Sequence, residues 1–479
     1  MGPDAAATLA GVAWRAPVNQ GLRRAALPLA LLLLAASWLW LQWPQVALLP
    51  GDEPLYFLDA QRLLDGGALY RDIFLAHPPA RVWQAALVLA IGAPAGWAKF
   101  WSPLATIATA GVLVEIGRRH APFAGVIGAL LFLFAKVVLL HGALFVGVEQ
   151  AMFLAVIATA LVLSKRWLLA GMVLGFATQW ALHVGILALP LLVLAHRDGV
   201  LRRFAGGLAL GLVPLALELA WYGQPMVEQV FGYHLRKVTD MAAQKVPDRV
   251  WPFLEAHGGL LIIAGLGVAR VSGPFRRLGF IGFSALGVLL LWPRLQPYYF
   301  LLPIPMLAAV AAAFLLQLYR QPRPTRARIR DSVVLFVAVV ALLVDILPAR
   351  HEERSLDRRE RMLTAQTEMA ALAAQVQTLA HGQPLWGDGA LVPLLSLRTR
   401  LPVALGDTDL NSQRFLSGLT QPAPHLSQVL AQKPLIVLVP RHGIDLVPEF
   451  HDRLLRDCDV VGEFDAKAAN FAGLLLRPR

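Results

Sequence analysis

Two adjacent carboxylates, Asp52 and Glu53, directly follow a long apolar run at 25–49. A positioned carboxylate can take the proton from a hydroxyl group, so the pair is a candidate general base for a transfer reaction. The plain alternative is a pair of solvated loop acids. Two features favour chemistry: the end of an apolar span partly desolvates a charge, and a third acid, Glu149, opens a later apolar run.

The segment after the acid pair predicts a shaped surface. Pro54 suits the start of a helix, and Gly66–Gly67 suits its end. Between them the residue pattern predicts an amphipathic helix in the plane of the membrane interface. Its apolar stripe is opposite the polar residues Asp59, Gln61, Arg62 and Asp65. The turn His77-Pro78-Pro79 then leads into an apolar segment at 80–93.

The composition excludes several classes of protein. Of 479 residues, 57% are hydrophobic and 15% are charged, and the mean hydropathy is +0.58, which excludes a soluble enzyme, a disordered protein and a disulfide scaffold. The single Cys458 forms no internal bridge and no cysteine metal cluster. The net charge of +12 lies in small groups between apolar runs, a pattern typical of membrane orientation and not of nucleic-acid binding.

The apolar runs predict a mostly α polytopic bundle with about eleven crossings, since a span needs about 20 helical residues. The predicted spans are 25–49, 97–117, 122–140, 149–163, 167–182, 184–195, 204–222, 258–269, 278–292, 298–318 and 332–347. Segment 80–93 is assigned to the outer interface or to a re-entrant turn. That assignment places five basic clusters on the cytoplasmic side, as the positive-inside rule requires: Arg118/Arg119, Lys165/Arg166, Arg197/Arg202/Arg203, Arg270/Arg276/Arg277 and the arginines from 320 to 330.

This threading divides the chain into three parts. Residues 1–24 form a cytoplasmic segment, and 25–347 form a transmembrane domain whose outer loops include 50–96 and 223–257. Residues 348–479 lie outside, where a helix at 351–380 precedes a small α/β domain. PLIVLVP at 434–440 is typical of a central parallel strand. The expected role of this domain is a cap that helps to bind the acceptor.

The outer motifs resemble those of a known family. Gly51-Asp52-Glu53-x-x-Tyr56, the stretch LLDGGALYRD at 63–72 and the His77 turn resemble the first periplasmic loop of the protein mannosyltransferase-like superfamily. This integral-membrane GT-C group includes protein O-mannosyltransferases and the aminoarabinose transferases that act on lipid A. Glu149 resembles a further acid of the family, and Gln296-Pro297-Tyr298-Tyr299 resembles its late aromatic motif. The likeness covers roughly residues 25–320.

The resemblance implies transfer of a sugar from a polyprenyl-phosphate donor to an acceptor hydroxyl by a single, inverting displacement. Asp52 takes the general-base role, Glu53 supports it or binds the acceptor, and Glu149 is the third acid of the site. The leaving phosphate needs cationic partners. The candidates are His77, Arg81, Arg236, Lys237 and Arg294, and the substrate-binding candidates are Tyr56, Tyr298 and Tyr299.

Several of these residues have alternatives. Members of the family commonly have Lys where this chain has His77, which could replace it when protonated or by hydrogen bonding. Arg236 and Lys237 also suit a solvated or headgroup-facing surface, and the tyrosine pair suits interfacial anchoring. No cofactor is indicated. A divalent metal held by Glu149 and the histidines at 141, 183, 234 and 257 stays open, although no two of these histidines have i, i+4 spacing.

The expected protein is therefore a glycosyltransferase of the bacterial inner membrane whose active site and C-terminal domain face the periplasm or exterior. Its partners are a polyprenyl-phosphate sugar, membrane lipids and a glycan, lipid or protein acceptor, with no nucleic acid. Two alternatives remain: a lipid or glycan transporter or flippase, and a GT-C-like scaffold without activity. A transporter would depend on charges in mid-membrane, of which Lys136 is almost the only clear case.

Overall fold

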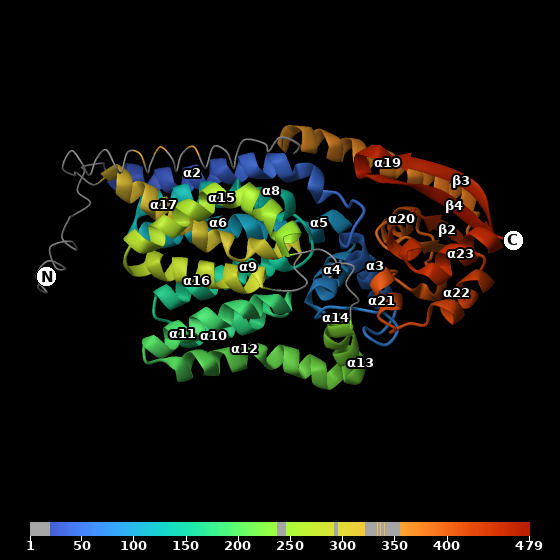
Figure 1. The fold of residues 1–479 in the computed structure, drawn as a ribbon, viewed down its shortest axis with the longest axis horizontal. Helices are drawn as coiled ribbons and strands as arrows, with labels where there is room; N and C mark the ends of the chain where they lie inside the picture. The colour runs from blue at the N-terminus through green and yellow to red at the C-terminus, as the bar shows by residue number, and fades with distance from the viewer. Residues whose placement is uncertain are drawn as a thin grey trace, which may run out of the picture.

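A computed structural model describes residues 20–236, 246–291, 296–320 and 355–479, together with Val333, Phe336 and Val340. The chain forms a helical bundle at one end and a small domain with a sheet at the other (Figure 1). Helices α3 (Glu53–Leu64), α4 (Ala80–Ala90) and α5 (Ala95–Lys99) lie between these two parts. The segment 53–99 is therefore placed where both parts can reach it.

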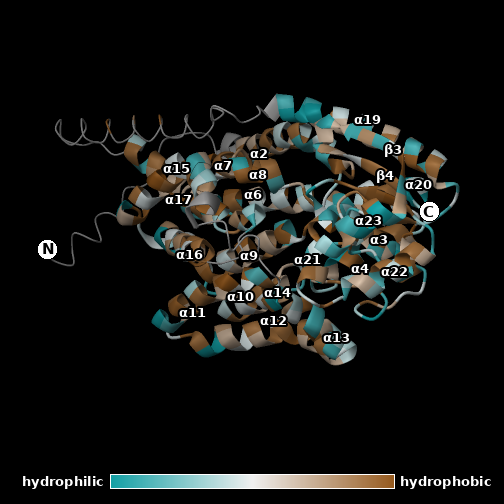
Figure 2. Ribbon diagram, turned by 45° about the vertical axis from the view of Figure 1, so that its right-hand side comes forward, coloured by the Kyte–Doolittle hydropathy of each residue, from teal (hydrophilic) through white to brown (hydrophobic). Residues whose placement is uncertain are grey.

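The bundle consists of long and short apolar helices. Five helices of the described residues are long and apolar enough to cross a membrane: Ala26–Val46, Gly96–His120, Leu201–Tyr222, Val250–Arg270 and Pro297–Tyr319. Hydrophobic residues dominate these helices, and hydrophilic residues gather on α19 and the C-terminal domain (Figure 2). This agrees with the predicted polytopic helical fold. The number of crossings stays a prediction, as does any span in 332–347, of which only three residues are described.

The helices of the bundle, in chain order, have these bounds: α2 (Gln20–Gln42), α6 (Trp101–His120), α7 (Pro122–Leu133), α8 (Lys136–His141), α9 (Val148–Leu163), α10 (Trp167–Ala177), α11 (Ala188–Arg197), α12 (Leu201–Tyr222), α13 (Gln224–Val227), α14 (Tyr233–Arg236), α15 (Val246–Arg270), α16 (Gly273–Leu290) and α17 (Ile304–Arg320). Short 3-10 or π turns occupy Trp43–Val46 (η1), Leu182–Leu187 (η2), Glu228–Gly232 (η3) and Pro297–Leu301 (η5).

Small residues let two of these helices touch through their backbones. Gly171 and Gly175 of α10 face Gly207 and Gly211 of α12, and a Cβ atom at any of the four would overlap backbone of the opposite helix. Both pairs have the small-xxx-small spacing that allows close approach in a membrane, where lipid supplies no hydrophobic driving force between helices. The four-residue spacing of both glycine pairs can be read directly from the sequence.

Helix α3 differs from the interfacial helix that the sequence predicts. Most of its residues are buried. Asp59, which the sequence places on the polar face, is itself fully buried. Leu58 belongs to the hydrophobic core of the C-terminal domain, and Phe57 packs on Phe145 of the loop before α9. The amphipathic pattern of the sequence predicts that only the apolar face of this helix is buried. The C-terminal domain covers the face that would otherwise contact water.

The C-terminal domain consists of a long helix and a four-stranded sheet. Helix α19 (Ser355–Ala380) leads into the sheet, whose strand order is β1-β2-β4-β3. Strands β1 (Leu385–Gly387) and β2 (Leu435–Leu438) pair in parallel, and β4 (Phe471–Pro478) pairs antiparallel with both β2 and β3 (Cys458–Ala466). Helices α20 (Val392–Thr399), α21 (Ser412–Leu416), α22 (Pro422–Ala431) and α23 (Pro448–Asp457) complete the α/β domain.

Strand β2 lies between β1 and β4 and is completely buried, as the apolar run at 434–440 predicts. The apolar stretch at 401–405 forms no strand of its own. It contributes a single bridge between Leu385 and Val403 and then turns through Leu405 (φ 56) into the loop at 406–411. This turn directs the loop toward α3, where Arg62 lies against Gly406.

Candidate active site

Asp52 stands at the N-terminal end of α3, at the junction of the bundle and the C-terminal domain. The side chain is exposed, and it precedes the first helical residues Glu53 and Pro54. Gly51 adopts φ +137°, and its N–H donates to Ala390 O in the loop after β1 (3.2 Å). The end of a helix that presents unpaired N–H groups favours a negative charge. Asp52 is thus an accessible carboxylate on a fixed backbone.

Glu53 is fixed in a buried ion pair. Its carboxylate lies 2.8 Å from Lys99 Nζ, and both side chains are nearly inaccessible, at 6% and 1% exposed. Lys99 also donates to Ala47 O (2.9 Å), and the other oxygen of Glu53 accepts from the N–H of Phe145. Burial raises the pKa of Glu53, and the Lys99 ammonium opposes that rise. These bonds join the start of α3 to the end of α5, to Ala47 directly after η1 and to the loop before α9.

Arg81 is a buried cation at the bundle side of the site. It extends from α4, is 4% exposed, and donates to Tyr56 OH (2.6 Å) and to Trp180 O (3.0 Å). Gly147 (φ +82°) packs against it, and a Cβ at that position would overlap Arg81 Nε. Only glycine combines this backbone conformation with so close an approach. The fold therefore reserves this space for the guanidinium group.

Glu149 lies near Arg81 but is not paired with it. The residue is fully buried in the first turn of α9, and neither carboxylate oxygen has a hydrogen-bonding side chain among the described residues. The Arg81 charge acts on Glu149, and so does Glu53. A buried carboxyl without a side-chain partner is costly, and such groups occur where a ligand or a proton completes the site.

The aromatic motif at 297–301 lies on the same side. Tyr299 and His183 have ring centroids 4.0 Å apart, Tyr298 and His141 have centroids 6.2 Å apart, and the charges of Arg81 and Asp52 reach both tyrosines. The motif therefore contacts two histidines for which the sequence left two alternatives, satisfied interfacial side chains and metal ligands. The charge of Arg81 also acts on His183.

His77 lies near Tyr56, with ring centroids 6.3 Å apart. It is half-buried, and its backbone carbonyl accepts from Tyr70 OH (2.7 Å). On the other side His234 of α14 contacts it, with centroids 5.3 Å apart and a bond from the His234 ring to Ala76 O (2.8 Å). The Pro-Pro turn thus brings His77 to the same site as Arg81, although the two are supported by different helices.

The C-terminal domain contributes Asp409, which the sequence did not single out. Its charge is coupled to Asp52, Tyr56 and Asp59, and its Oδ1 accepts from Asn411 N (2.9 Å). Burial is the largest cause that raises the pKa of Asp409 to about 6. No catalytic motif marks this residue, because its electrostatic coupling to Asp52 depends on the docking of one part of the chain on another.

The remaining predicted residues are less informative. Arg236 is exposed at the last residue of α14. Lys237 and Arg294 lie outside the described residues. Among the residues that the structure describes, no group of three or more His, Cys, Asp or Glu side chains could hold a metal ion. His257, one of the candidate ligands, is instead bonded to Val137 N and to Phe253 O.

Solved structures identify the architecture. No protein-family model and no curated protein sequence matches the chain. The chain is similar in structure to ArnT from Cupriavidus metallidurans, an aminoarabinose transferase. The crystal structure of ArnT bound to undecaprenyl phosphate matches with a TM-score of 0.63 at 14% sequence identity, and the match covers 96% of this chain and 98% of that chain. Its apo form gives a TM-score of 0.60 at 16% identity, over 93% and 97% of the two chains. The chain has the GT-C fold.

The GT-C architecture extends over both the bundle and the C-terminal domain, because the match covers nearly all of this chain. The predicted resemblance to the GT-C group is therefore confirmed at the level of fold. At 14–16% identity the match leaves open which side chains act, so the roles of the site residues are argued from their own geometry.

Proposed function

We propose that the protein is a membrane glycosyltransferase that moves a sugar from a polyprenyl-phosphate donor to an acceptor hydroxyl. One observation carries the proposal: a buried guanidinium, Arg81, is bonded to Tyr56, and the charge of an exposed carboxylate, Asp52, acts on the same Tyr56. The GT-C fold supports it, and the ArnT structure of that fold was solved with undecaprenyl phosphate bound. A base and an anion-binding cation are the two groups that such a transfer needs.

Asp52 is exposed and Arg81 is buried, and we assign them different roles in the transfer. Asp52 takes the proton of the acceptor hydroxyl as the hydroxyl oxygen bonds to the anomeric carbon. The bond from that carbon to the phosphate oxygen breaks, and Arg81 meets the charge that develops on the lipid phosphate. A single displacement of this kind inverts the anomeric centre. The hydroxyl of Tyr56 accepts a hydrogen bond from Arg81 (2.6 Å), and this bond orients the guanidinium group within the site.

Glu53 has a different role in this proposal from the one the sequence suggested. Both carboxylate oxygens of Glu53 are bonded within the protein, to Lys99 and to Phe145 N, and the side chain is buried, so it is not accessible to an acceptor. Glu53 therefore positions Asp52. Glu149 and the Tyr298–Tyr299 motif lie beside Arg81, at the end of the site that would receive the phosphate and the first part of the donor. Asp409 belongs to the C-terminal domain, and its charge acts on Asp52, so in this proposal it lines the entry of the acceptor.

We place this reaction on the outer face of a bacterial inner membrane, with the C-terminal domain in the periplasm. The positive-inside distribution of Lys and Arg supports this orientation.

The test uses the purified full-length protein reconstituted in liposomes with radiolabelled polyprenyl-phosphate sugars and a panel of glycan, lipid A and peptide acceptors. We expect consumption of one donor by the wild type, and a fall of at least about a hundredfold for Asp52→Asn, the usual range for loss of a general base. Asp65→Asn is the matched control, because Asp65 is an exposed acid at the far end of the same helix. Transport of lipid without consumption of any donor would instead support a flippase.

A further inference from the structure

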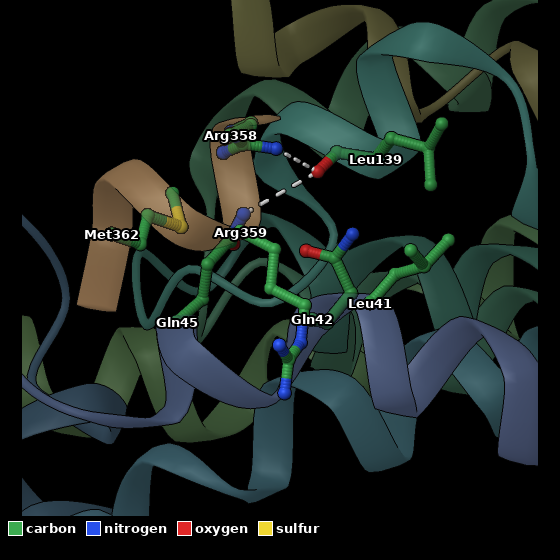
Figure 3. A pocket seen from close by; sticks show the side chains of 7 residues that line it. All are labelled: Leu41, Gln42, Gln45, Leu139, Arg358, Arg359 and Met362. Atoms are coloured by element: carbon green, nitrogen blue, oxygen red, sulfur yellow. Dashed lines mark hydrogen bonds between the residues drawn. The ribbon is translucent and has the colours of Figure 1, made fainter. Parts of the chain in front are cut away.

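Helix α19 meets the outer end of α2 at a small pocket that is separate from the candidate active site. The pocket is lined by Leu41, Gln42, Gln45, Leu139, Arg358, Arg359 and Met362 (Figure 3). The two arginines are adjacent in sequence but point to opposite sides of the pocket (Figure 3). Their different surroundings indicate different tasks.

Arg358 makes its hydrogen bonds within the protein. Its guanidinium donates to the carbonyl oxygens of Leu139 and Leu140, which are unpaired at the end of the short helix α8. Gln45 Nε2 reaches the same Leu139 carbonyl at 3.4 Å. Arg358 thus fastens α19 to the bundle.

Arg359 points to the other side, over Trp40. Its guanidinium lies 4.6 Å from the centroid of the Trp40 ring, and its Nε donates to Trp40 O (3.3 Å). Among the described residues, its two terminal nitrogens make no hydrogen bond and no ion pair. A guanidinium with its terminal donors available is suited to a bidentate contact with an anion.

The face of α2 that carries Trp40 is apolar and exposed, as a face in contact with lipid would be. Only 11% of the apolar window of this helix is buried inside the protein. The exposed residues Leu29, Leu32, Leu33, Trp40 and Trp43 recur at helical spacing and form one stripe. Tryptophans at the end of such a stripe mark the level of the lipid headgroups. Arg359 is therefore held by an indole ring at the depth where phosphates occur.

The geometry points to a binding site for the phosphodiester of an anionic phospholipid, formed by Arg359 and Trp40 where α19 crosses α2. The terminal nitrogens of Arg359 bind the phosphate, Trp40 packs against the glycerol and upper acyl chain, and the Gln42 amide lines the adjoining pocket. None of the pocket's lining residues carries a carboxylate that would pair with the amine of a zwitterionic headgroup. The bound lipid would fasten the start of α19, and so the C-terminal domain, to the outer leaflet.

The test measures lipid binding to the purified full-length protein by native mass spectrometry, with dioleoyl phosphatidylglycerol and dioleoyl phosphatidylcholine as probes. We expect the wild type to bind phosphatidylglycerol more tightly, and Arg359→Gln to weaken that affinity about fivefold, the effect of one basic residue at an anionic surface. Trp40→Leu removes the stacking ring but keeps an apolar residue, and should weaken it as well.

Arg361→Gln is the matched control, because it removes the same charge from α19 two residues further on and should leave the preference unchanged. Equal affinity of the wild type for the two lipids would overturn the inference. So would an equal loss in both arginine variants. If inorganic phosphate displaced the phosphatidylglycerol at millimolar concentration, the site would bind a free anion, and the lipid assignment would be wrong. None of these outcomes depends on glycosyltransferase activity.

Discussion

Replacement of Lys99 by Met should lower the free energy of unfolding of the protein, because it breaks a buried ion pair next to the candidate active site. The ammonium group makes two buried bonds, to Glu53 (2.8 Å) and to Ala47 O (2.9 Å), and Met fills similar space without either bond. Glu53 would then keep a buried carboxylate that only the Phe145 N–H stabilises. Removing one partner of a buried ion pair costs about 3–5 kcal/mol, because the remaining charge is left uncompensated.

The assay is the free energy of unfolding in mixed detergent micelles, measured for Lys99→Met, Glu53→Gln and the double variant. We expect the double variant to be less destabilised than the sum of the singles, with a coupling of about 2–3 kcal/mol. Lys467→Met is the control, since Lys467 and Asp465 form an exposed pair at 3.6 Å that should contribute little. Equal stability of Lys99→Met and Lys467→Met would refute the reasoning.

Two further predictions concern the walls of the site. Gly147→Ala should lower the affinity for undecaprenyl phosphate and destabilise the protein more than Gly92→Ala, since both glycines have positive φ but only Gly147 packs on Arg81; equal effects in binding and unfolding assays would contradict this. Asp409→Asn should flatten the pH dependence of stability between about pH 4 and 7. Because the pKa of Asp409 is raised from 3.8 to about 6 in the folded chain, its protonation stabilises the fold fully below about pH 4, and this contribution, at most ~3 kcal/mol, is lost as the pH rises through 6. Thermal unfolding across that range checks it, and parallel pH profiles of the two proteins would count against it.

The helical architecture was predictable because membrane spans are encoded locally. In lipid every backbone polar group must be bonded within its own helix, so a sufficiently long apolar run specifies its own structure. The small α/β domain was also predictable from buried strands such as the run at 434–440, which forms β2. The burial of α3 was not, because it depends on a domain more than 300 residues away in the sequence.

The candidate site divides in the same way. The sequence by itself determined that Asp52 follows the first span and that a Pro-Pro turn places His77 and Arg81 after it, since these features depend on neighbouring residues. Only the tertiary structure decided that Glu53 is held by Lys99, that Arg81 bonds Tyr56 and that Asp409 lies beside Asp52. Each of these contacts joins distant segments, and its geometry is set by how helices and domains pack against one another.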